Sequence, residues 1–128
     1  MNFNIEADFV RKCIKKECQE RLLFELHSTK HREKAISRFS HSAESVLKKG
    51  FINCSISDLQ NKFYKTMQTE NCYIISGDSY DGKIFSFAEA IEHCKTSYMA
   101  IVLISSKIIA VREELEKTQP LLFVYILN

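Results

Sequence analysis

Three apolar runs near the end of the chain constrain its fold more than any other feature. They cover residues 98–104, 107–112 and 121–127, are rich in β-branched residues, and are separated only by turn-length connections. Runs of this kind predict β-strands, and their short connections predict an antiparallel meander. Apolar and polar residues do not alternate along them, so both faces of the sheet should be covered. Helices or a partner would provide the cover, and a face left bare would serve a homodimer or another partner.

Apolar periodicity predicts helices in the first part of the chain. Every fourth residue from Val10 onward is apolar, which predicts an amphipathic helix of about five turns over 5–26. A break is expected near Ser28 or Thr29, because both residue types cap helices well. A second helix follows and ends at Gly50, since glycine is favoured where a helix ends in a left-handed conformation. The two helices should pair as a hairpin.

The middle of the chain mixes short helices and strands. The pattern predicts an edge strand or extended link at 51–56, a helix opened by a capping box at 57–60, and a strand at 72–76. Residues 77–82 predict a polar loop, and a second capping box at 86–89 opens another helix. The order predicts one α+β domain over all 128 residues. Its N-terminal helical hairpin and short helices would pack on a mainly antiparallel sheet of about four strands.

Composition excludes several classes of protein. The chain has one Pro and three Gly, which argues against disorder, and it lacks an apolar run long enough to cross a membrane. The first residues carry acids and lack the apolar core of a secretory signal, which predicts a cytoplasmic protein without a membrane partner. The five cysteines are scattered without a C-x-x-C pair. We therefore expect buried, free thiols rather than a disulfide framework.

Two short patterns are candidates for chemistry. Residues 73–79 resemble the nucleophile block of the Gly-Asp-Ser hydrolases, but no His follows His93 to supply the base that Ser79 would need. His27 and His31 have the i, i+4 spacing of metal ligands, but the Lys and Arg residues around them repel a cation. Glycine motifs for phosphate binding do not occur. We therefore expect no enzyme activity, no catalytic residue, no metal site and no cofactor.

Charge divides the chain into a basic part and an acidic part. Residues 1–50 hold eleven Lys and Arg against seven Asp and Glu, and residues 51–128 hold seven against nine. Acidic residues gather in two predicted turns, one of which also carries a tyrosine. Carboxylates beside an aromatic ring suit recognition of a basic protein surface. The predicted partner-binding residues are Asp78, Ser79, Tyr80, Asp81, Glu113, Glu114 and Glu116.

A basic stripe in the second predicted helix supports an alternative function. Lys30, Arg32, Lys34 and Arg38 lie over about two helical turns and could follow a phosphate backbone. Acidic residues, among them Glu33, interrupt the stripe. The alternative is therefore a small nucleic-acid-binding or regulatory protein that uses this basic face.

In size, predicted fold and lack of an active-site motif, the chain resembles the immunity proteins that neutralise bacterial contact-dependent or polymorphic toxins. Residues 32–41 are similar to segments of small bacterial proteins. The resemblance implies a tight inhibitor that covers the active site, or a neighbouring surface, of a cognate toxin domain, often a nuclease. It assigns no functional residue. The leading prediction is a non-catalytic protein-binding module of this kind.

Overall fold

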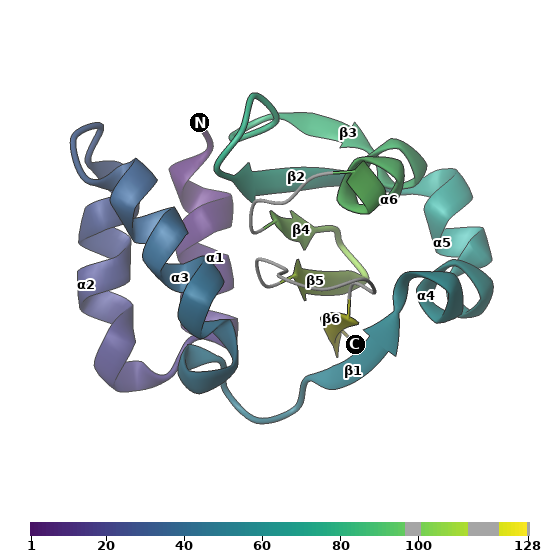
Figure 1. The fold of residues 1–128 in the computed structure, drawn as a ribbon, viewed down its shortest axis with the longest axis horizontal. Coiled ribbons are helices and arrows are strands. Elements are labelled where there is room, and N and C mark those ends of the chain that lie inside the picture. The colour runs from purple at the N-terminus through teal and green to yellow at the C-terminus, as the bar shows by residue number, and fades with distance from the viewer. Residues whose placement is uncertain (97–100, 113–120, 128) are drawn as a thin grey trace.

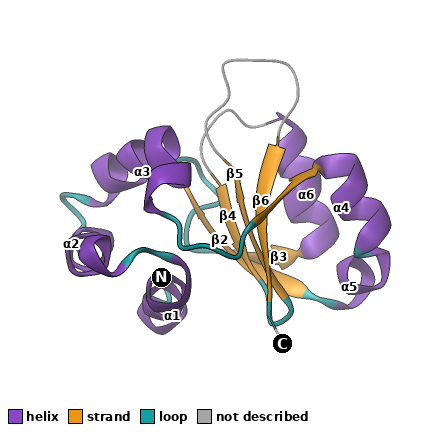
Figure 2. Ribbon diagram, turned by 90° about the horizontal axis from the view of Figure 1, so that it is seen from below, coloured by secondary structure: helices purple, strands orange, loops and turns teal. Residues whose placement is uncertain are grey.

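An antiparallel sheet of six strands runs through the middle of the fold, between two layers of helices (Figure 2). The computed structural model describes residues 1–96, 101–112 and 121–127. The strands are β1 (Ile52–Ser55), β2 (Asn71–Ser76), β3 (Ile84–Ser86), β4 (Ile101–Ile104), β5 (Ile108–Arg112) and β6 (Leu121–Ile126). The helices are α1 (Phe3–Cys13), α2 (Lys16–His27), α3 (Arg32–Val46), α4 (Ile56–Lys62), α5 (Tyr64–Thr69) and α6 (Phe87–Thr96). The predicted α+β class is confirmed, with more strands than expected.

The predicted meander forms the centre of the sheet. β5 pairs with β4 and β6 in antiparallel register, so that Val111 lies opposite both Val102 and Phe123. The full strand order is β1-β6-β5-β4-β2-β3. The extended segment predicted at 51–56 is confirmed as the edge strand β1, whereas the short edge strand β3 was not predicted.

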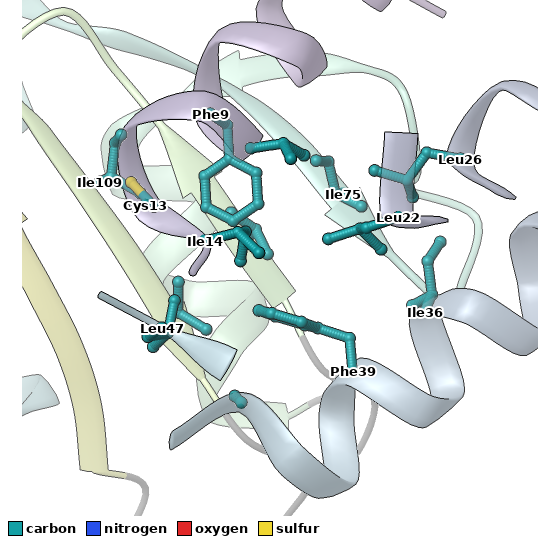
Figure 3. Packing of buried hydrophobic residues seen from close by; sticks show 14 of the residues in the cluster. Phe9, Cys13, Ile14, Leu22, Leu26, Ile36, Phe39, Leu47, Ile75 and Ile109 are labelled. Carbon is teal, nitrogen blue, oxygen red and sulfur yellow. The ribbon is translucent and has the colours of Figure 1, made fainter. Parts of the chain in front are cut away.

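Each face of the sheet carries its own apolar core, as the lack of alternation in the strands predicts. Helices α1 to α3 cover one face, where Phe9 and Phe39 meet edge to face with ring centroids 6.4 Å apart (Figure 3). Helices α4 to α6 cover the other face, where Phe87 and Leu59 are fully buried. Neighbouring residues of one strand belong to different cores: on β2, Ile75 belongs to the first core and Ile74 to the second. Burial of each such side chain contributes about 1.5–3 kcal/mol.

The single helix predicted over 5–26 is wrong, because the chain breaks between α1 and α2. Ile14 leaves the helical conformation and forms an antiparallel bridge with Leu47. The amide of Lys15 donates a hydrogen bond of 2.8 Å to the carbonyl of Val46. This break turns the chain so that α2 packs beside both α1 and α3 (Figure 1). The first layer therefore contains three helices instead of a hairpin.

Helix starts follow local hydrogen-bonding chemistry. The capping box predicted at 86–89 is confirmed, because the Ser86 hydroxyl accepts a hydrogen bond of 3.2 Å from the amide of Glu89. The box predicted at 57–60 is wrong by two residues: Ser55, the last residue of β1, caps α4 instead. Gly50 has a φ of +112°, but it lies in the turn before β1, since α3 already ends at Val46.

Candidate functional site

Three connections meet at one end of the fold: the N-terminus, residues 28–31 between α2 and α3, and residues 77–82 between β2 and β3 (Figure 1). They border a cleft of about 390 Å³, which we call the end cleft. Its apolar wall consists of Met1, Phe3, Leu26 and Ile36. Its charged lining consists of Arg32, Glu33, Asp78 and Asp81.

Arg32 is buried behind this cleft and binds two carboxylates. Its Nη1 and Nη2 each donate a 2.7 Å hydrogen bond to Glu6, and its Nε and Nη2 donate to Asp81 at 2.8 and 2.9 Å. The fifth N–H group donates to the carbonyl of Leu26 at 2.9 Å. A guanidinium has five donors, so every one is used inside the protein. The Arg32 side chain is only 7% exposed, and that of Glu6 is fully buried.

The network joins distant parts of the chain. Glu6 lies on α1, Arg32 begins α3, and Asp81 lies in the β2–β3 loop. Burial opposes the charge of Arg32, but its hydrogen bonds with Asp81 and Glu6 outweigh burial and raise its pKa. The hydroxyl of Tyr73 on β2 donates to Glu6, and burial together with this bond raises the pKa of Tyr73 to about 12. Two carboxylates around one guanidinium leave a net negative charge.

Asp78 ties the same loop to the second helical layer. Its Oδ1 accepts hydrogen bonds from the Ser76 hydroxyl at 2.7 Å and the Tyr80 amide at 2.9 Å. Its Oδ2 lies 2.7 Å from Nε2 of His93 on α6. Burial would raise the pKa of Asp78, but the bonds from Ser76, Tyr80 and His93 together lower it below its usual value. The loop is therefore fixed to both helical layers.

The carboxylates of the first acidic turn bind groups within the chain. Asp78 and Asp81 do not project freely toward a partner, because both carboxylates are engaged within the chain. Tyr80 stacks on His93 with ring centroids 3.7 Å apart, and also on Phe85. Ser79 is exposed and makes no hydrogen bond within the described part of the chain. The remaining predicted acids, Glu113, Glu114 and Glu116, lie outside the described residues.

The side chains of the predicted basic face lie in different environments. Arg32 does not belong to it, because the side chain points inward to Glu6 and Asp81. Arg38 is partly exposed but binds Glu25, and this hydrogen bond lowers the pKa of that carboxyl against the effect of burial. Lys30 and Lys34 remain exposed. The face thus keeps fewer available cations than the sequence indicates.

The end cleft continues into exposed side chains that were not predicted. Met1, Phe3 and Phe24 are 65%, 45% and 66% exposed. The Phe3 ring lies 4.4 Å from that of His27, and the Phe24 ring lies 6.1 Å from that of His31. Phe24 and His27 are three residues apart on α2, so they are neighbours on its surface. We call these five residues the aromatic patch. The sequence signal was that Phe24 lies off the apolar row of α2.

Several other kinds of site find little support in the described residues. No three His, Cys, Asp or Glu side chains gather there in a way that could hold a metal ion. No helix among the described residues is long and apolar enough to cross a membrane. Burial raises the pKa of three thiols to about 12, which disfavours the nucleophilic thiolate at Cys13, Cys72 and Cys94. No protein-family model, curated protein or solved structure matches this chain.

Proposed function

We propose that this chain is a non-catalytic protein-binding module whose interface is the aromatic patch with the end cleft. The observation that carries this proposal is the exposure of Met1 and Phe3, which line the end cleft, together with that of Phe24, which lies three residues from the lining residue His27 on α2. Aromatic residues and Met are enriched in the buried centres of protein interfaces, where they supply much of the binding energy. Exposed apolar side chains gathered in one place, rather than scattered singly, are typical of an interaction site.

The rigidity of the surrounding chain supports the same function. Asp81 and Asp78 fix the β2–β3 loop to Arg32 and His93, so this border of the cleft is ordered before any partner arrives. The amide of Asn2 donates a hydrogen bond of 3.0 Å to the hydroxyl of Tyr73, which positions the residues on either side, Met1 and Phe3. A surface that is already ordered loses less conformational entropy on binding, and it binds more tightly for the same contacts.

For the partner, we propose a cognate toxin domain, with a nuclease as the first class to test. This part of the proposal rests on the resemblance of the sequence to immunity proteins and on the absence of a recognisable catalytic motif. A cytoplasmic inhibitor would need only a rigid surface that covers the toxin's active site or a neighbouring region. The chain would then need no cofactor of its own.

The experiment is co-purification from the native host, followed by mass spectrometry of the retained proteins. The test variant is Phe3→Ser combined with Phe24→Ser, and the control is Tyr64→Ser, which removes an equally exposed aromatic from α5 in the other layer. The wild type and the control should retain the same partner, and the double variant should lose it. If the retained partner is a toxin, an equimolar amount of this chain should inhibit it. Retention of the partner by the double variant would contradict the proposed interface.

A further inference from the structure

The end cleft combines an apolar wall with an excess of negative charge, and together these features favour one kind of side chain from a partner protein. We propose that the cleft receives the cationic end of a lysine or arginine side chain of the partner protein, an inference that rests on the proposed function. Met1, Phe3 and Leu26 form the wall that would contact the aliphatic stem. Glu33, at the start of α3, is the carboxylate that would meet the charge.

The charges around the cleft favour a cation over an anion. Among the described residues, Glu33, Asp78 and Asp81 line it with negative charge, against the guanidinium of Arg32 and the α-ammonium group of Met1. Arg32 cannot recruit an anion, because all five of its N–H groups already donate within the protein. Glu6, bound behind Arg32, adds a further negative charge. Charge complementarity therefore favours a positively charged group as the occupant of the cleft.

Glu33 differs from the other carboxylates of the cleft. Asp81 is bound to Arg32, and Asp78 is bound to His93. Glu33 is exposed, and its carboxylate has no ion pair or hydrogen bond within the described residues. It can therefore form a new charge-assisted hydrogen bond without losing an existing one.

The apolar wall distinguishes a side chain from a bare ion. The methylene stems of Lys and Arg pack along apolar surface while their charged ends stay polar. Phe3 is 45% exposed, and its ring would add a cation–π contact with the bound cation. A volume of about 390 Å³ exceeds what a metal ion requires. A long basic side chain can contact the apolar wall with its methylene groups and the negative charge with its cationic end.

The test is a titration of the full chain with butylguanidinium chloride, followed by ¹H–¹⁵N NMR at pH 7. Its neutral counterpart, butylurea, has the same shape and serves as the matched probe. We expect saturable shifts at the amides of Thr29, Glu33 and Gly77 with the guanidinium, and much weaker shifts with the urea. Glu33→Gln should weaken binding about threefold to fivefold. Glu20→Gln removes an exposed carboxylate outside the cleft lining and should leave the titration unchanged.

The inference is overturned if butylguanidinium produces no saturable shift at these amides, if butylurea binds equally well, or if Glu33→Gln has no effect. Such a result, obtained while the aromatic patch still retains a protein partner, would refute the cation site alone. The converse result, guanidinium binding in a chain whose patch retains no protein, would refute the proposed function alone.

Discussion

Replacing Arg32 by methionine tests the buried network most sharply, because Met keeps much of the side-chain length and removes the charge. The substitution would leave Glu6 fully buried without a cation and would free Asp81 from its pair. Breaking a buried ion pair from one side costs about 3–5 kcal/mol, a large share of the roughly 5–15 kcal/mol that stabilises an ordinary domain. The expected fall in melting temperature is roughly 10–20 °C.

Arg38→Met is the matched control, because the sequence places both arginines in one stripe. The Arg38 side chain is 44% exposed where it binds Glu25, so its loss should cost less than about 1 kcal/mol. Urea denaturation at pH 7, followed by circular dichroism, measures both variants. If Arg32→Met lowers the free energy of unfolding no more than Arg38→Met does, the buried network does not stabilise the fold.

The double variant Arg32→Met with Glu6→Gln supplies a second test, because it removes the buried carboxylate that Arg32→Met leaves without a cation. Adding Glu6→Gln should recover part of the loss, and this double variant can be measured if Arg32→Met alone does not fold.

Three further predictions concern buried thiols, the loop and a turn. Between about pH 8.5 and 10, the free energy of unfolding should fall by roughly 1.4 kcal/mol per buried thiol per pH unit, because thiols ionise in the unfolded chain but not in the native one. Urea denaturation midpoints, measured with a reductant present, follow this fall. The thiols with native pKa near 12 are Cys13, Cys72 and Cys94. In acid, the free energy of unfolding should fall as the pH drops through about 4, because the native pKa of Asp78 lies below its unfolded value. In an acid denaturation titration, the Asp78→Asn variant should show a shallower fall than the wild type. Gly50→Ala should lower the urea-derived stability by about 1–3 kcal/mol, because φ is +112° and the new Cβ would lie 3.2 Å from the Tyr125 ring. Gly77→Ala, at a position without positive φ, should cost much less.

The central sheet could be predicted because its signal is local. The strands β4 to β6 are continuous apolar runs, and their lack of alternation correctly indicated that both faces are covered, although it did not decide between helices and a partner as the cover. β3 has only three residues, too few for a periodic signal. The break after α1 could not be predicted, because the apolar row of every fourth residue passes through Ile14 without interruption. That break depends on the bridge to Leu47, a contact that periodicity does not encode.

The candidate site was only partly accessible from the sequence, because long-range pairs decide which charges are free. Proximity along the chain grouped Arg32 with Lys30, whereas the fold pairs it with residues 26 and 49 positions away. A signal did exist: Glu6 precedes Val10 by four residues and Arg32 precedes Ile36 by four, so both charges lie on apolar helix faces. Opposite charges on two apolar faces indicate a buried pair.

Hydrogen–deuterium exchange of the complex with the retained partner is the measurement that tests the proposed interface most directly. We expect slower exchange on binding in residues 1–5, 24–33 and 77–82, which carry the aromatic patch and border the end cleft. Exchange in α4, α5 and the edge strand β1 should stay unchanged. Protection confined to those elements, with none at the end cleft, would show that the partner binds elsewhere and would contradict the proposed interface.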